Sequence, residues 1–330
     1  MEAPQPLPTT VLTGFLGSGK TTLLRRALKA PSLFDTAVVI NEIGAVGIDH
    51  YLVDFVEGDV LELPGGCLCC ALREDLAQTL RSLLERRAAG AIRRFRRVVV
   101  ETTGLADPAP ILYTLGADPT LDGALAPAQV VTLVDALSGA DTLDRFAEAG
   151  RQTALADRIV ISKTDLAPVS PALAARLDAL NAAAPRVFAA DVADPAALLF
   201  AAPGSRAPTP PQGAEPHATH SHGIDAFAIV LEGALSRLDF ARALGSLARD
   251  RGNDLLRVKG ILRFSDRPER PAVVQGAQHA IFAPEWLDDW PDADTRSRLV
   301  FIVHDIPRAA ILERFAFARP APWSAAPPSP

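Results

Sequence analysis

The sequence predicts an α/β fold with a mostly parallel sheet and helices on both of its faces, followed by a small α+β domain. Three observations predict it. Short apolar runs alternate with helical stretches between residues 8 and 188, an order typical of βαβ units. These runs are almost unbroken in apolar residues, as expected for strands that are buried on both faces. Beyond a proline-rich segment starting near residue 201, the order becomes roughly β-α-β-β-β-α.

The individual elements follow from apolar periodicity. In the first part of the chain we expect strands at 9–12, 37–40, 98–100, 130–134 and 159–161, and helices at 22–30 and about 72–87. In the second part we expect strands at 227–231, 255–264, 273–275 and 299–303, and helices at 238–249 and 308–315. The expected organisation is a domain at 1–200, a Pro/His-rich linker at 201–223, an α+β domain at 224–318 and a flexible tail at 319–330.

Composition excludes several classes of protein. The 330 residues carry 33 Lys and Arg against 39 Asp and Glu, a net charge of −6, which argues against a nucleic-acid binder. Apolar runs stay below the roughly 18 residues that a membrane span needs, and the first residues do not form a signal segment, so we expect a cytoplasmic protein without a membrane anchor. The 3 cysteines fall within four positions, which indicates a site rather than a disulfide scaffold.

A glycine-rich loop follows the first expected strand. Residues 14–21 read GFLGSGKT and match G-x-x-x-x-G-K-[ST] between a strand and a helix, the context that a phosphate-binding loop requires. Its backbone N–H groups and the helix N-terminus favour bound phosphate. The expected nucleotide-binding residues here are Gly14, Gly17, Ser18, Gly19, Lys20, Thr21 and Thr22. We expect Lys20 to bridge the β- and γ-phosphates and the Thr21 hydroxyl to bind Mg²⁺. The chain is thus predicted to have a P-loop NTPase sheet.

Two acidic strand ends are candidates for the magnesium site. The run 98–104 is an apolar strand that ends in Glu101, with Gly104 three residues further on. The carboxylate can hold the Mg²⁺ shell and the Gly104 N–H can meet the γ-phosphate. Glu42 follows the second strand and is a further candidate for Mg²⁺ or its waters, as is Asp49, although a solvated loop acid is the alternative for both.

The run 159–165 resembles a guanine-recognition motif, N-K-x-D, with Ser162 in the place of Asn. The Asp165 carboxylate can accept both hydrogen bonds from guanine N1 and N2, which adenine does not offer. The stem of Lys163 can pack on the base. The sequence therefore favours GTP over ATP, and an ordinary Ser/Asp turn is the alternative.

Three thiols, Cys67, Cys69 and Cys70, lie together just before the helix expected at 72–87. A helix N-terminus favours thiolates, and thiolates select ions such as Zn²⁺ or Cu(I). Three ligands in one loop leave a position open for exchange, which favours metal transfer over a closed structural site. Redox chemistry of Cys67 and Cys70 and buried core cysteines are the alternatives. His217, His220 and His222 in the linker are candidates to capture or deliver a metal, or are simply solvated.

In combination these runs resemble the CobW-like GTPases, a family of metal chaperones and metallocentre assembly proteins related to nickel-insertion GTPases. The resemblance rests on residues 14–22, 41–44, 66–70, 101–104 and 162–165, and on 257–262 and 274–279 in the second domain; it covers about residues 8–318. It implies GTP hydrolysis coupled to delivery of a metal, most often Zn²⁺ but also Co²⁺ or another transition metal, to a client metalloprotein. Many members carry an acid where this chain has Ala45, which implies one metal ligand fewer here.

The leading hypothesis is therefore a cytosolic, Mg²⁺-dependent GTPase whose GTP or GDP state controls a zinc site. Lys20, Thr21, Glu101 and Gly104 would carry the hydrolysis. Two alternatives stay open: a P-loop kinase or small-molecule transferase, and a zinc-storage protein in which GTP is a structural ligand. The client, the physiological metal and assembly into a homo-oligomer are not determined by the sequence.

Overall fold

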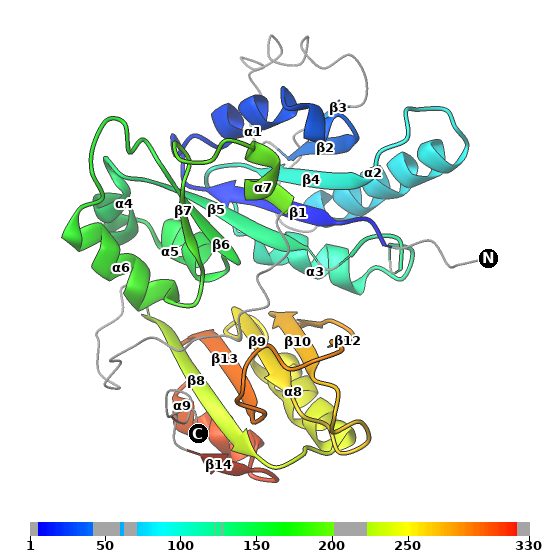
Figure 1. The fold of residues 1–330 in the computed structure, drawn as a ribbon, viewed down its shortest axis with the longest axis vertical. Coiled ribbons are helices and arrows are strands. Elements are labelled where there is room, and N and C mark those ends of the chain that lie inside the picture. The colour runs from blue at the N-terminus through cyan, green and yellow to red at the C-terminus, as the bar shows by residue number, and fades with distance from the viewer. Residues whose placement is uncertain are drawn as a thin grey trace. The chain divides into compact units, whose positions relative to one another are not determined.

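The computed structural model describes residues 6–41, 60–62, 71–121, 123–126, 128–200 and 223–321. The chain divides into two compact units, each with most of its residue–residue contacts inside the unit (Figure 1). One contains Met1–Leu173 and Ala184–Ala202, and the other contains Ala174–Ala183 and Pro203–Pro330. Each unit is built on its own sheet.

The first unit contains a sheet of seven strands in the order β3-β2-β4-β1-β5-β6-β7, and every neighbouring pair is parallel. The strands are β1 (Thr9–Gly14), β2 (Thr36–Asn41), β3 (Val60–Glu62), β4 (Arg97–Thr102), β5 (Gln129–Asp135), β6 (Arg158–Ser162) and β7 (Arg186–Phe188). Because the strands run parallel, their carboxyl ends meet at one edge of the sheet, where ligands of such folds bind. The predicted fold class is confirmed.

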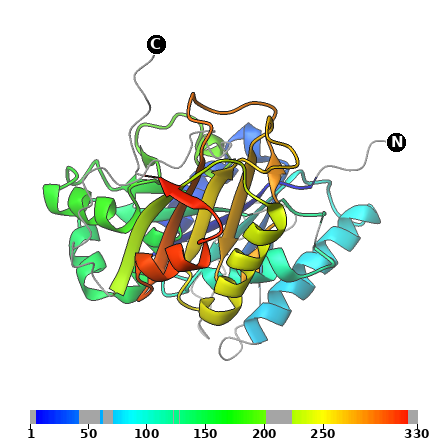
Figure 2. The same ribbon diagram turned by 90° about the horizontal axis from the view of Figure 1, so that it is seen from below.

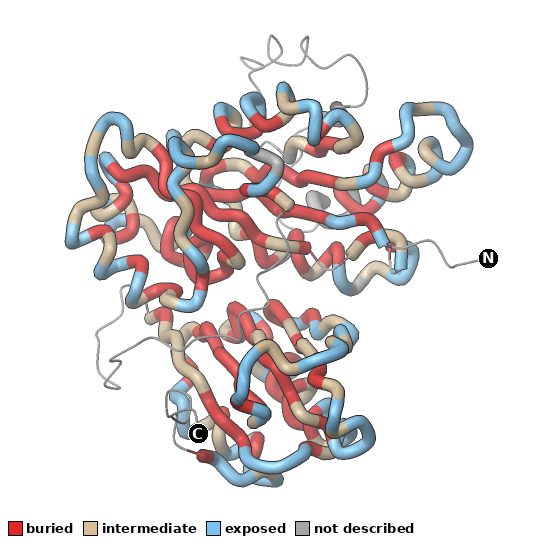
Figure 3. Tube along the Cα trace, in the orientation of Figure 1, coloured by how far each residue is buried: buried red, intermediate tan, exposed pale blue. Residues whose placement is uncertain are grey.

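Helices cover both faces of this sheet. They are α1 (Lys20–Leu28), α2 (Ala71–Ala88), α3 (Ala109–Ala117), α4 (Gly139–Arg145), α5 (Ala147–Ala154) and α7 (Pro195–Phe200), with a 3-10 turn at Pro31–Leu33. A further helix, α6 (Pro171–Asn181), begins in this unit, and its residues from Ala174 onward are grouped with the second unit. Figure 1 shows α1 and α7 on one face and α3 and α5 on the other. On the α1 face, Leu23 and Leu24 pack with Leu12, Val99 and Val131 of the strands. The strands are the most buried part of this unit (Figure 3).

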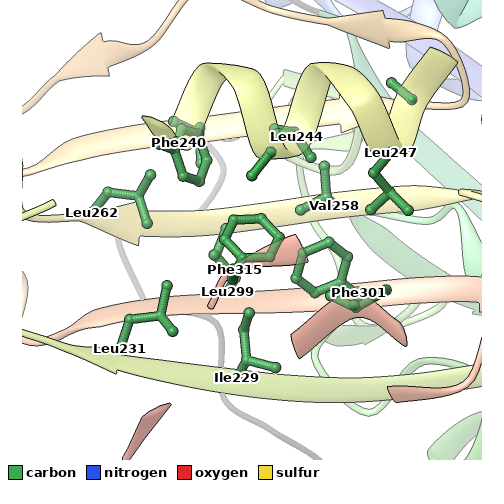
Figure 4. Packing of buried hydrophobic residues seen from close by; sticks show 14 of the residues in the cluster. Ile229, Leu231, Phe240, Leu244, Leu247, Val258, Leu262, Leu299, Phe301 and Phe315 are labelled. Carbon is green, nitrogen blue, oxygen red and sulfur yellow. The ribbon is translucent and has the colours of Figure 1, made fainter. Parts of the chain in front are cut away.

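The second unit is an antiparallel sheet with two helices on one face (Figure 2). The strand order is β11-β10-β9-β13-β8-β14, and β12 pairs with β10. Its elements are β8 (Ile224–Glu232), α8 (Arg237–Arg251), β9 (Arg257–Leu262), β10 (Ala272–Ala277), β11 (Ala280–Ile281), β12 (Glu285–Trp286), β13 (Ser297–His304), α9 (Arg308–Arg314) and β14 (Arg319–Ala321). Phe240 of α8 packs with Phe315 just after α9, and Phe301 of β13 packs on the same ring (Figure 4).

The differences from the sequence expectations lie in the helices α3 to α7, which were not expected at particular residues, in short strands and in element ends. β3, β7, β11, β12 and β14 have two or three residues each and give too little periodicity to be recognised. Residues 319–321, expected to begin a flexible tail, instead form β14, which pairs with β8. Pro320 is tolerated there because β14 is an edge strand. The helix expected from residue 22 begins at Lys20, directly after Gly19.

Candidate nucleotide site

The phosphate loop connects β1 to α1 through backbone conformations that need glycine. Gly14 has φ 141° and Gly19 has φ 97°, in the left-handed region that side chains rarely adopt. A β-carbon at Gly14 would also lie 2.4 Å from the Leu133 carbonyl oxygen of β5. Gly19 caps α1 without a side-chain hydrogen bond. The first N–H groups of a helix have no partner within it, so this end of α1 is suited to bind an anion.

Lys20 is folded back over the loop that precedes it. Its side-chain Nζ donates hydrogen bonds to the Gly14 carbonyl at 2.8 Å and the Phe15 carbonyl at 3.2 Å, and the residue is only 8% exposed. An ammonium group held over a cradle of backbone N–H groups places a positive charge where the β- and γ-phosphates of a nucleotide would lie.

Thr21 and Glu101 are brought together across the sheet. Thr21 lies in the first turn of α1, and Glu101 lies near the carboxyl end of β4, which pairs with β1. The Thr21 hydroxyl donates to Glu101 Oε1 at 2.8 Å, and Glu101 is 4% exposed. Among the described residues, no group of three or more His, Cys, Asp or Glu could hold a metal. A hydroxyl and one carboxylate nevertheless fit Mg²⁺, which fills its other positions with water and phosphate oxygens.

The backbone after β4 lies directly against the phosphate loop. A β-carbon at Gly104 would lie 2.6 Å from the Leu16 amide nitrogen, so glycine is required by close approach. This contact places the Gly104 backbone beside the loop that cradles the phosphates. The hydrogen bond from the Ala106 N–H to the Thr103 carbonyl, at 3.2 Å, makes this segment a tight turn.

Ser162, which stands where the guanine motif has Asn, links β6 to the phosphate loop. Its hydroxyl donates to the Ser18 carbonyl at 2.6 Å in a buried position. The next residue, Lys163, has φ 57°, a backbone conformation that is unusual for residues other than glycine. It costs free energy, which contacts with the surroundings must offset. The Leu166 N–H donates to its carbonyl at 3.0 Å. Asp165 is exposed at the same edge of the sheet.

Asp135 holds the Lys163 side chain, a role that the sequence analysis missed. Its carboxylate lies 3.6 Å from Lys163 Nζ and accepts hydrogen bonds from the Ser138 N–H at 2.7 Å and the Ser138 hydroxyl at 3.0 Å. The Phe15 ring of the phosphate loop also stacks on Phe146, with 4.6 Å between ring centroids. In a sequence, an acidic residue at the end of a strand, such as Asp135, is only a weak indication of a site residue. Two phenylalanines far apart in the chain give no indication that their rings will stack.

Several predicted site residues lie outside the described residues. They are Glu42, Asp49, Cys67, Cys69, Cys70, His217, His220 and His222, together with Ala45. Of the predicted site, the structure brings together the phosphate loop, the magnesium candidates Thr21 and Glu101, and the guanine motif beside them. It does not test the predicted cysteine site. Among the described residues, no helix is long and apolar enough to cross a membrane.

A strand, a glycine loop and a helix, with the Thr21–Glu101 pair beside them, define a P-loop nucleotide-binding protein. Its particular family follows from comparison. The model of the "CobW/HypB/UreG, nucleotide-binding domain" matches residues 8–188, and that of the "Cobalamin synthesis protein cobW C-terminal domain" matches residues 224–319. The chain belongs to the CobW/HypB/UreG family.

Similar proteins extend over the full chain. Zinc chaperone YjiA of Escherichia coli (strain K12) is 33% identical, over 95% of this chain and 99% of its own length. Zinc chaperone CobW of Sinorhizobium sp is 28% identical, over 92% of this chain and 95% of its own length. The crystal structure of Zn(II)-bound YjiA GTPase from E. coli is similar with a TM-score of 0.71 and 30% identity, covering 96% of this chain and 100% of that one.

Proposed function

We propose that this protein is a Mg²⁺-dependent GTPase that binds Zn²⁺ and transfers it to a client metalloprotein. The hydrogen-bonded pair of Thr21 and Glu101 beside a phosphate loop carries the hydrolytic part of this proposal. The cargo is supported by relatives named zinc chaperones and by the structural likeness to a Zn(II)-bound GTPase.

The nucleotide is held at the carboxyl edge of the parallel sheet. Backbone N–H groups of residues 14–22 bind the phosphates, and Lys20 exchanges its two carbonyl partners for β- and γ-phosphate oxygens. The guanine base lies between the stem of Lys163 and the Asp165 carboxylate, which accepts from N1 and N2. Ser162 keeps this loop in register with the phosphates through its bond to the Ser18 carbonyl.

Thr21 and Glu101 hold Mg²⁺, which neutralises charge that develops on the transferred phosphoryl group. The Gly104 N–H meets the γ-phosphate, so the position of the turn after β4 depends on whether GTP or GDP is bound. Glu42, with Asp49 as a further candidate, joins the magnesium shell or its waters. Phosphoryl transfer to water needs a correctly placed nucleotide and charge stabilisation rather than a covalent intermediate, and these residues provide both.

Zn²⁺ is held by the thiolates of Cys67, Cys69 and Cys70 and is cargo rather than a resident cofactor. Three thiolates leave one coordination position open, through which a ligand from the client can enter. His217, His220 and His222 serve in capture or delivery, and a related ion such as Co²⁺ fits the same donors. We place this activity in the cytoplasm, where thiols remain reduced.

The decisive experiment measures Zn²⁺ affinity by chelator competition on the reduced full chain without nucleotide, with GDP·Mg²⁺ and with a non-hydrolysable GTP analogue·Mg²⁺. We expect the affinity to differ by about tenfold or more between nucleotide states, a coupling of about 1.4 kcal/mol. A variant with serine at the three cysteine positions should lose this difference while retaining GTP hydrolysis. Equal affinities in all three states would instead indicate zinc storage.

GTP turnover with and without zinc tests the chemistry itself. Phosphate should be released into water, slowly in the isolated chain because these residues do not position the attacking water by themselves. Radioactive phosphate appearing on a small acceptor would refute hydrolysis and identify a kinase. Hydrolysis of ATP at the same kcat/KM as GTP would refute the assigned role of Asp165.

A further inference from the structure

Gln152, on the short helix α5, connects that helix to the turn that follows β4. The residue is completely buried, and its side-chain Nε2 donates to two carbonyl oxygens of the turn, Gly104 at 3.1 Å and Ala106 at 2.9 Å. One neutral amide group of a completely buried residue therefore supplies hydrogen bonds to two carbonyl groups of the turn, and the bond to Gly104 is buried as well. The proposed GTPase mechanism assigns no role to this side chain.

The orientation of the Gln152 amide is determined by its surroundings. Turning the amide over would direct its oxygen at two carbonyl oxygens, and the acceptors would repel one another. The backbone of the same residue is held as well, because the Thr132 hydroxyl of β5 donates to the Gln152 carbonyl at 2.8 Å. Beside it, Arg151 lies 3.3 Å from the Asp107 carboxylate, a second link between α5 and the turn.

The other end of α5 contacts the phosphate loop. Phe146, the residue that precedes the helix, stacks on Phe15 of that loop with 4.6 Å between ring centroids. Gly104 in turn lies against the backbone of Leu16. One helix of eight residues thus holds the loop that binds the α- and β-phosphates and also the turn assigned to the γ-phosphate.

We propose that Gln152 is a positioning residue that holds the turn after β4 where its backbone meets the γ-phosphate, and so allows the site to distinguish GTP from GDP. This inference rests on the proposed function, because it takes the γ-phosphate to bind at Gly104. It assigns the ability to sense the third phosphate to a contact between α5 and the turn, rather than to the phosphate loop. By linkage, γ-phosphate binding must stabilise α5 in return.

The test replaces Gln152 by Met, which keeps the length and flexibility of the side chain and removes the donor. Affinities for GDP·Mg²⁺ and for a non-hydrolysable GTP analogue·Mg²⁺ are measured on the full chain by calorimetry. We expect the GDP affinity to stay within about twofold of the wild type and the analogue affinity to fall about tenfold or more. Thr132→Val is the matched control, since it removes a buried hydrogen bond to the same residue without touching the turn.

A second measurement uses the unaltered protein, in case the variant folds poorly. Hydrogen exchange of the α5 amides should slow when the GTP analogue replaces GDP. Equal losses of GDP and analogue affinity in Q152M, or unchanged discrimination, would overturn the inference. Hydrogen exchange of the α5 amides at the same rate with GDP and with the GTP analogue would also overturn it. A wild-type chain that binds neither nucleotide would refute the proposed function itself, whereas a wild type that discriminates no better than Q152M refutes only the role of Gln152.

Discussion

Replacing Glu101 by Gln tests whether Glu101 is a magnesium ligand or a residue that only supports the fold. Glu101 is 4% exposed and accepts a hydrogen bond from Thr21 at 2.8 Å. The E101Q side chain has the same size and still offers an oxygen acceptor, but it lacks the negative charge. The substitution therefore keeps the packing and changes the electrostatics alone.

The expected magnitudes differ for stability and for binding. A hydrogen bond to a charged group contributes about 1.5–3 kcal/mol and a neutral one about 0.5–1.5 kcal/mol, so the free energy of unfolding should fall by about 1 kcal/mol. Removing a buried charge offsets part of that loss. Mg²⁺, in contrast, loses an anionic partner, and the Mg²⁺-dependent part of GTP affinity should fall about tenfold or more, which is about 1.4 kcal/mol.

The assay titrates Mg²⁺ at a fixed concentration of a fluorescent GTP analogue, and urea unfolding is measured in parallel. Thr102→Val is the matched control, because the neighbouring Thr102 hydroxyl donates to the Thr13 hydroxyl at 2.8 Å in an equally buried position. T102V should lose about 1 kcal/mol of stability and keep its Mg²⁺ response. An unchanged Mg²⁺ response in E101Q, or an equal loss in T102V, would refute the reasoning.

Two further predictions concern single contacts. Ser162→Ala removes the buried bond to the Ser18 carbonyl, so GDP and GTP affinities measured by calorimetry should fall together; a loss confined to GTP would contradict this. In the second unit, hydrogen bonding from Arg296 lowers the pKa of Asp294 below its ordinary value. The resulting stabilisation is present above the unfolded pKa of about 3.9 and is lost as pH falls through the lower folded value. Asp294→Asn should remove this acid-side slope from unfolding free energies measured between about pH 5 and pH 2.

Sequence alone predicts the parts of the site whose chemistry is local. The loop at 14–21 needs glycine for its backbone, a lysine for charge and a hydroxyl for Mg²⁺, and all of these lie within one turn of chain. The five strands expected in the first part of the chain match β1, β2, β4, β5 and β6, because their apolar residues are consecutive and alternate along the chain with helical stretches. Family membership follows from the same motifs.

The tertiary structure decides which distant residues meet. Thr21 and Glu101 are 80 positions apart along the chain. They touch because β1 pairs with β4 in the sheet and not with β2, the strand that follows β1 in the sequence. Gln152 and Gly104 are 48 positions apart, on a helix and a turn without any shared motif. A buried glutamine in a short helix has no periodicity or spacing that marks it.

The physical reason is the range of the interactions. Backbone conformation, glycine at positive φ and the chemistry of a phosphate loop depend on neighbours in the chain, so the sequence displays them directly. Hydrogen bonds such as that from Ser162 to Ser18, and ring stacking of Phe15 on Phe146, depend on strand order and helix placement. These are set by the packing of the whole sheet. The sequence by itself therefore determines which chemical groups are available to bind a nucleotide. Only the folded chain determines how the loops that carry those groups are held together.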